Sequence, residues 1–142
     1  MSQNLIIMDK LSRWLHLLPA LIASLIDIAI SVFHQPKGYW AGNLNEANEG
    51  NPIGALFMEN HVSGLFVISG IEVLLIIVLG YYLPTRISRY LLLFVLIAHS
   101  CAASTWISSR YGFWYTMALA LFNSLTYLIA NDLIKKRSAM KS

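Results

Sequence analysis

Four side chains that could take part in chemistry stand inside long apolar stretches of the sequence: Asp27, Glu72, His99 and Asn123. Acids and imidazoles take up and release protons, and all four side chains can hydrogen-bond to a polar ligand. An ionised side chain at the centre of a bilayer costs about 2.5 to 3.5 kcal/mol on insertion scales, so such residues rarely face lipid. If the apolar stretches cross a membrane, we expect these side chains to face one another inside the protein.

The spacing of polar residues within the stretches predicts a shared polar interior. His16 lies 11 residues before Asp27, and His61 lies 11 residues before Glu72. Eleven residues are close to three full turns of an α-helix, so the members of each pair share a helical face. The stretch "HSCAAST" that begins at His99 offers small residues, which allow close contact between helices. We expect one polar or small stripe on each helix, with the four stripes facing inward.

The residues leave several roles open for this polar interior. Glu72 is expected to be either protonated or compensated by a cation, and the sequence does not distinguish the two. Asn123 could serve only to hydrogen-bond across helices, as membrane amides often do. His16, His34 and His61 lie near the expected interfaces, where water can satisfy them. No metal site is predicted, because the spacing differs from the helical His-x-x-x-His of zinc enzymes.

The composition predicts that a membrane surrounds these residues. The chain has 142 residues, of which 57% are hydrophobic and 12% are charged, whereas soluble domains carry about 25% charged residues. A spanning helix needs about 20 mainly apolar residues. Four stretches qualify, and together they predict one all-α, integral membrane four-helix bundle covering residues 1–142. The expected spans are residues 11–34, 61–83, 87–107 and 113–134.

The distribution of positive charge predicts the orientation of the bundle. Basic residues flank the start of the first span, fill the turn between the second and third spans, and follow the fourth span; they are Lys10, Arg13, Arg86, Arg89, Lys135, Lys136, Arg137 and Lys141. Because cytoplasmic loops carry an excess of Lys and Arg, we expect both termini on the cytoplasmic side. Tyr39, Trp40 and Trp106 are expected at the outer interface. The first span lacks a small-residue cleavage site, so we expect it to be a retained anchor.

The segment of about residues 35–60 is the expected outer loop. It is polar, acidic and rich in Asn and Gly, so we expect it to be irregular. Asn51 is a favourable N-cap and Pro52 suits the first position of a helix, so a helix is predicted to begin there. The apolar residues that follow are too few to span a membrane. They are expected to lie at the outer interface or to extend the second span outward.

Two resemblances cover most of the chain. The order of Asp27 and then Glu49-Gly50-Asn51-Pro52 resembles a group of small prokaryotic membrane proteins with a Glu-x-Asn-Pro signature. Asp27, Asn51-Pro52 and Glu72, with His99 in a third helix, also resemble the EXPERA domain of emopamil-binding and sigma-2 receptor proteins. The resemblances imply the cytoplasmic membrane of a prokaryote and a membrane pocket for a sterol-like or cationic small molecule. The Gln and Pro that follow the EXPERA glutamate are absent here, which argues against its isomerase activity.

Three functions remain open at this point. The first is binding of a lipid-like or cationic small molecule in an intramembrane pocket formed by Asp27, Glu72, His99 and Asn123. The second is a small structural subunit of a larger membrane complex, and the third is a proton or cation pathway. No nucleotide loop, nucleophile elbow, haem motif or CxxC occurs, so no cofactor is expected and enzyme activity stays undecided. Expected partners are membrane lipids and a membrane protein or second copy; no nucleic-acid motif accompanies the ten basic residues.

Overall fold

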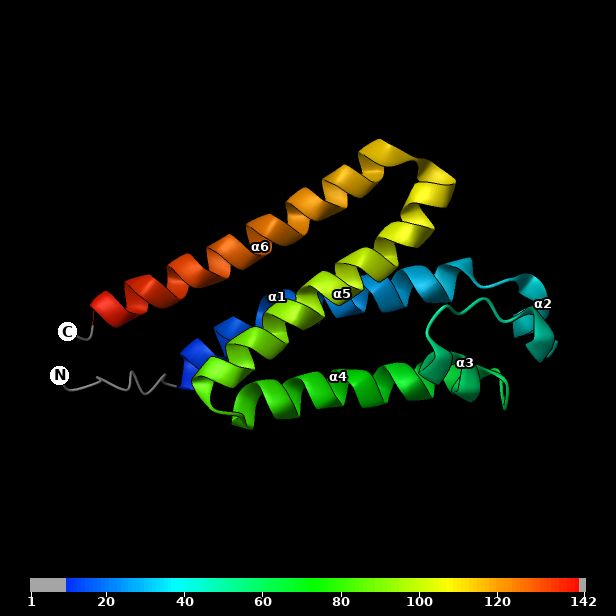
Figure 1. Ribbon diagram of the computed structural model, residues 1–142, viewed down its shortest axis with the longest axis horizontal. Helices are drawn as coiled ribbons and strands as arrows, with labels where there is room; N and C mark the ends of the chain where they lie inside the picture. Colours follow the sequence, from blue (N-terminus) through cyan, green and yellow to red (C-terminus); the bar gives the residue numbers. More distant parts are fainter. Residues whose placement is uncertain (1–9, 141–142) are drawn as a thin grey trace.

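The computed structural model describes residues 10–140, and this part of the chain is helical with no strand. Four long helices form the body of the molecule (Figure 1): α1 (Lys10–His34), α4 (Gly64–Tyr82), α5 (Thr85–Tyr111) and α6 (Phe113–Ala139). Three short helices lie between α1 and α4: α2 (Lys37–Trp40), η1 (Leu44–Glu46) and α3 (Pro52–Met58). Each long helix is long and apolar enough to cross a membrane. The all-helical prediction with four apolar helices is therefore confirmed, while Lys141 lies outside the described residues.

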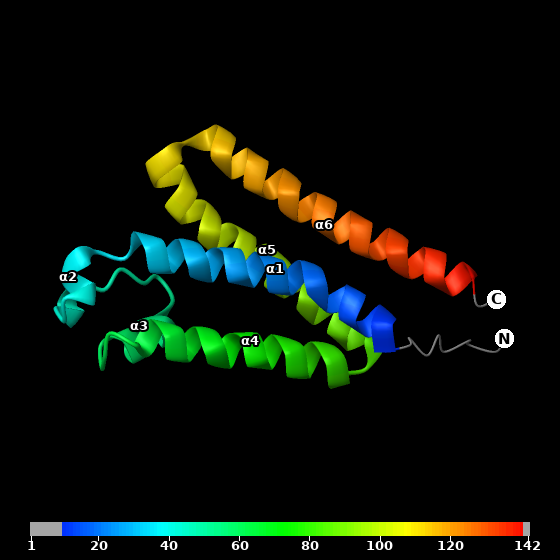
Figure 2. The ribbon, with the colours of Figure 1, turned by 180° about the vertical axis from the view of Figure 1, so that it is seen from behind.

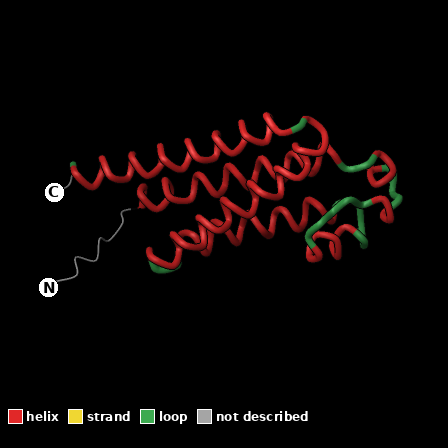
Figure 3. Tube along the Cα trace, turned by 45° about the horizontal axis from the view of Figure 1, so that its top comes forward, coloured by secondary structure: helices red, strands yellow, loops and turns green. Residues whose placement is uncertain are grey.

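The long helices are arranged around α1, which contacts each of the other three. Helix α5 also contacts α4 and α6. Figures 1 and 3 place α4 and α6 on opposite sides of the pair formed by α1 and α5. The pair of α1 and α5 therefore separates α4 from α6. The polar stripes of the four helices do not all meet at one place, contrary to the prediction from the sequence.

The two ends of the molecule differ in character (Figures 1 and 2). At one end, here called the basic end, α1 begins, α4 meets α5 and α6 stops. At the other, here called the loop end, α2, α3 and the turn between α5 and α6 lie. Gly112 makes that turn with a φ of +88°, a conformation that side chains with a Cβ rarely adopt. The ends of the predicted spans that carry most of the Lys and Arg residues thus gather at one end.

The half of the bundle near the basic end has a closely packed apolar core. Leu17, Ala20, Ile76 and Leu92 are buried against one another. Gly80 lies beside them on α4, and a Cβ added there would meet the side chain of Leu17 and come within 2.9 Å of Leu92 Cδ2. Glycine at this position lets α4 approach α1 and α5 closely.

The segment at the loop end is more ordered than the sequence predicts. Tyr39 and Met58 are fully buried and pack with Leu65, and the Tyr39 hydroxyl donates to the carbonyl oxygen of Val62 at 2.9 Å. Burial raises the pKa of this hydroxyl, which keeps it protonated as a donor. The expected irregular loop therefore includes two short helices, α2 and η1, and Tyr39 forms part of a small core instead of an exposed interfacial belt.

Helix α3 begins where the sequence predicts. The Asn51 side chain accepts a hydrogen bond from the backbone N–H of Ile53 at 3.0 Å, and Pro52 is the first helical residue. The N-cap prediction is thus confirmed. The helix ends at Met58, and α4 starts at Gly64 rather than at residue 61. A turn separates the two helices, so α3 is not a continuous extension of α4.

Candidate functional site

His99 joins two acids from two other helices. Its Nδ1 lies 2.9 Å from Asp27 Oδ2 and its Nε2 lies 3.2 Å from Glu72 Oε1. The three residues come from α5, α1 and α4 respectively. Asp27 and His99 are buried, whereas the Glu72 side chain is 40% exposed. The structure therefore brings together three of the four predicted site residues, which we call the Asp–His–Glu cluster.

The hydrogen bonds of the Asp–His–Glu cluster constrain its protons. An imidazole ring donates from both nitrogens only when it is protonated, and two carboxylates then leave a net charge of −1. If the ring is neutral instead, one acid must supply the proton for one of the two bonds. This second form has the same number of protons and the same net charge. A proton can thus shift between His99 and either acid without a change in the charge of the cluster.

A cavity of about 370 Å³ lies between the cluster and the loop end. Asp27, Glu72 and His99 line it, together with Ser31, Ser69, Thr105 and Trp106 and several apolar residues. Glu49, Gly50, Asn51 and Gly54 line it from the loop and α3. The Glu-x-Asn-Pro segment and the Asp–His–Glu cluster, which lie far apart in the sequence, therefore share one cavity.

Two local features place Glu49 at this cavity. The Gln35 side chain, at the end of α1, donates from Nε2 to the Asn48 carbonyl at 2.7 Å and accepts from the Asn48 N–H at 2.9 Å. Glu49 Oε1 then accepts from the Asn51 N–H at 2.7 Å. Gly54 leaves the necessary space, because a Cβ there would come within 2.9 Å of Glu49 Cγ. The two bonds between Gln35 and Asn48 thus hold the loop against the end of α1 at the residue before Glu49.

The cavity is strongly acidic. Asp27, Glu49 and Glu72 line it, and none of its described lining residues is Lys or Arg. Arg110 lies just outside, with its guanidinium carbon 4.8 Å from the centre of the Trp106 ring. Among the described residues, the second carboxylate oxygen of Asp27 is buried without a hydrogen-bond partner. This oxygen could accept a bond from a donor inside the cavity, because a buried oxygen without a partner is unfavourable.

The cluster does not have the arrangement of a metal site. Asp27 and Glu72 approach opposite edges of the His99 ring, so they do not converge with one ring nitrogen on a common point. In the part of the chain that the structure describes, no group of three or more His, Cys, Asp or Glu side chains is placed to bind a metal ion.

Asn123 does not belong to the Asp–His–Glu cluster. Its Nδ2 donates to Ser100 Oγ at 2.7 Å, and it lies in a groove between α5 and α6. His16, His34 and His61 also lie away from the cluster; His16 accepts from Arg89 Nε at 2.8 Å.

Sequence reasoning did not identify Glu49 and Trp106 as cavity residues. The signal for Glu49 was its place in the Glu-x-Asn-Pro segment.

The fold and the site define a class: a helical protein with four helices able to span a membrane and an Asp–His–Glu cluster that lines an acidic cavity. Comparison with protein-family models, curated proteins and solved structures gave no match.

Proposed function

We propose that the chain is an integral membrane protein whose acidic cavity binds a small, amphipathic cation. The observation that carries the proposal is the meeting of Asp27, His99 and Glu72 at the wall of the 370 Å³ cavity, which Glu49 also lines. Its size lies within the range of small-molecule sites. The cluster contributes one negative charge and Glu49 adds a further carboxylate, so a cation is the ligand whose charge offsets that of the cavity.

The position of Glu72 supports this proposal. Its side chain is 40% exposed although it lies in the middle of an apolar helix. His99 occupies one of its oxygens, and a carboxylate can accept further hydrogen bonds. An ammonium group in the cavity would bond to Glu72, while the rest of the ligand would contact Trp106 and Leu65. Three residues of the cavity wall, Asp27, Glu72 and His99, also carry the proposed resemblance to the EXPERA domain.

The proton or cation pathway is the less supported alternative. His99 bonds to an acid on each side, as a proton relay requires. Toward the basic end, however, Leu17, Ile76 and Leu92 pack closely. Ile76 follows Glu72 by one helical turn, so closely packed apolar side chains begin one turn from the cluster on its basic-end side, where a pathway would have to continue. The structural-subunit alternative differs from ligand binding in what it predicts for Glu72.

Replacement of Glu72 tests the proposal. Glu72→Gln keeps the shape and hydrogen bonding of the side chain but removes its charge. Phenethylammonium, which can donate hydrogen bonds, and its uncharged carbon analogue propylbenzene serve as matched probes, and a bound ligand raises the melting temperature of the protein. We expect the ammonium probe alone to stabilise the parent protein and to lose this effect in Glu72→Gln. Equal stabilisation of parent and variant, or a preference for the uncharged probe, would contradict the proposal.

Glu72→Leu distinguishes a binding role from a structural one. Leucine also removes the hydrogen bond to His99. In a purely structural subunit, Glu72→Gln should be silent, because an amide also bonds across helices, and leucine can even stabilise. Unchanged probe binding in both variants, with a stable leucine variant, would support the structural alternative.

A further inference from the structure

A second cavity, of about 340 Å³, lies near the basic end between α1, α5 and α6. Its polar lining consists of His16, Arg89, Tyr90, Tyr127, Asn131 and Lys135. None of its described lining residues is acidic. The nearest acid along the chain, Asp132, pairs with Lys135 at 4.0 Å on the exposed surface of α6. The charge of this cavity is thus opposite to that of the cavity beside the Asp–His–Glu cluster.

Arg89 is oriented in this cavity without being neutralised. Its Nε donates to Nε2 of His16 at 2.8 Å, so this imidazole nitrogen is an acceptor and carries no proton. No carboxylate forms an ion pair with Arg89 in the described part of the chain. The guanidinium has further N–H groups arranged as a planar fork, which matches the oxygens of a phosphate. An anion is the ligand that completes this arrangement.

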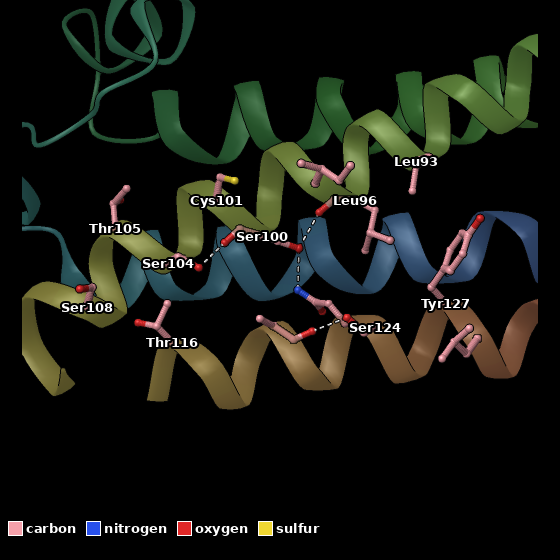
Figure 4. Close-up of a pocket in the computed structure, with 14 residues that line it drawn as sticks. Leu93, Leu96, Ser100, Cys101, Ser104, Thr105, Ser108, Thr116, Ser124 and Tyr127 are labelled. Carbon is pink, nitrogen blue, oxygen red and sulfur yellow. Dashed lines mark hydrogen bonds between the residues drawn. The ribbon is translucent and has the colours of Figure 1, made fainter. Parts of the chain in front are cut away.

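The basic cavity continues into an apolar groove of about 830 Å³ between α5 and α6 (Figure 4). Leu93, Leu96 and Tyr127 line both, so the two spaces adjoin. From Leu93 to Ser108 the groove follows 16 residues of α5, and the 15 steps between them span about 22 Å at 1.5 Å per step. One leaflet of a bilayer has a hydrocarbon depth of about 15 Å, so the groove is long enough for an acyl chain.

The hydroxyl groups of the groove do not make it polar. Ser100 and Ser104 donate to the carbonyl oxygens of Leu96 and Ser100, each 2.6 Å away on the same helix. Ser124 donates in the same way to Ala120 at 2.8 Å, and Figure 4 shows these bonds along the helices. Such internal bonds satisfy the hydroxyl hydrogens without water. The groove therefore presents mainly carbon atoms to its occupant.

We propose that the basic cavity and the groove together bind one anionic phospholipid. Its phosphate lies against Arg89 and Lys135, and one of its acyl chains lies along the groove past Ala120. The charge of the cavity selects the headgroup, and the adjoining apolar groove selects a lipid over a free phosphate. Basic pockets between membrane helices are general sites for acidic lipid headgroups. The proposal depends on membrane insertion but not on cation binding at Glu72.

Lipid binding to the full chain in detergent tests the headgroup site. Native mass spectrometry counts the adducts formed with phosphatidylglycerol and with phosphatidylcholine of the same acyl chains. We expect one tightly bound phosphatidylglycerol per chain. At about 1 kcal/mol for each basic residue, Arg89→Gln/Lys135→Gln should weaken it roughly 30-fold. The control Arg86→Gln/Lys136→Gln removes the same charges outside the cavity and should bind as the parent does. Equal loss in both double variants would reduce the effect to bulk charge and overturn the proposal.

One further variant and a competition experiment keep the headgroup test interpretable. Arg89→Lys keeps the charge but removes the planar fork and changes the bond to His16, so it should lose clearly less binding than the double glutamine variant. If it loses as much as the double glutamine variant, the effect comes from the Arg89–His16 contact and the proposed site is wrong. An excess of inorganic phosphate should displace little phosphatidylglycerol; complete displacement would indicate a site for free phosphate instead.

The acyl-chain part has its own matched pair. Ala120→Phe places a ring in the groove, whereas Ala118→Phe adds the same ring to an exposed position of α6 outside it. We expect at least a 10-fold loss of phosphatidylglycerol binding for Ala120→Phe and none for Ala118→Phe. Unchanged binding in Ala120→Phe would overturn the groove as the chain site. Lipid-free dimers that Ala120→Phe abolishes would show that a second copy occupies the groove, and would also overturn the proposal.

Discussion

At the scale of single residues, His99 divides the Asp–His–Glu cluster into two unequal halves. The bond to Asp27 is buried between α1 and α5, whereas Glu72 is partly exposed where it lines the cavity. A ligand can therefore compete for Glu72 without breaking the buried bond. We expect the Asp27–His99 pair to stabilise the bundle and Glu72 to contact the ligand.

Removal of the shared histidine should destabilise the fold. His99→Leu leaves Asp27 buried without its partner, and breaking a buried pair by removing one member costs about 3 to 5 kcal/mol. The free energy of unfolding in detergent measures this loss. His61→Leu is the matched control, because the His61 side chain is exposed and its ring bonds to Ser63, two residues further along the chain. Its replacement should cost less than about 1 kcal/mol, and equal costs for the two variants would contradict a stabilising role for His99.

The residues of the cluster could be predicted from their cost in a membrane, but the complete cavity could not. Asp27, Glu72 and His99 stand out because each interrupts an apolar stretch. Glu49 and Trp106 lie where polar and aromatic residues are usual, at the ends of spans and in loops. The presence of Glu49 at the cavity depends on the path of the loop after Gln35, which the sequence pattern does not specify.

At the scale of elements, the packing of α3 on α4 positions the cavity wall at the loop end. The N-terminal turn of α3 supplies Asn51 and Gly54, and its C-terminal turn packs on the start of α4. The capping residues predicted this helix from sequence, because Asn followed by Pro is a local signal. Burial of Tyr39 was not predicted, because it depends on contacts with Met58 and Leu65 from later elements.

Asn51 should contribute measurably through its cap. Asn51→Ala removes the acceptor for the Ile53 N–H, and loss of such a cap costs about 1 kcal/mol. Asn51→Asp should be tolerated, because aspartate also caps and its charge suits the positive end of the helix. Thermal unfolding in detergent compares the two. A stable alanine variant beside a destabilised aspartate variant would refute the capping role.

Gly64 should not tolerate even one extra carbon. A Cβ at Gly64 would overlap the backbone carbonyl of Phe57 and lie 2.8 Å from the Met58 nitrogen. Gly64→Ala must therefore displace backbone, and we expect a loss of about 1 to 3 kcal/mol. Gly70→Ala is the control within the same helix, because nothing lies within 4 Å of its added Cβ. Alanine is the better helix former by about 0.8 to 1.0 kcal/mol, so the control should be neutral or stabilised. Similar melting temperatures for both variants would be the contrary result.

At the scale of the whole molecule, the basic end gathers the start of α1, the end of α6 and the turn between α4 and α5 (Figure 1). The number of long helices could be predicted because each needs only its own length and composition. Which helices face each other could not, because a polar stripe indicates which side of a helix is buried but not which helix covers it. Asn123 is the example: it bonds to Ser100 on α5, on the side of the α1–α5 pair away from α4.

Accessibility labelling tests the orientation in the membrane. In a Cys101→Ser background, cysteines at Asn45 and at Ser138 lie at the loop end and the basic end respectively. The excess of Lys and Arg predicts that the basic end faces the cytoplasm. We expect an impermeant thiol reagent to label position 45 from outside and position 138 only after the membrane is opened. Labelling of both positions from one side would require an even number of crossings between them, instead of the expected three.

The bond between Asp27 and His99 has a consequence for biosynthesis. The two residues are 72 positions apart, and α1 leaves the ribosome before α5 has been made. At about 5 to 20 residues per second, the delay is roughly 4 to 14 s. During this interval the first hydrophobic helix contains an acid whose partner does not yet exist. Nascent α1 is therefore expected to wait beside the insertion machinery, with Asp27 protonated or hydrated, and to enter the lipid only once α5 arrives.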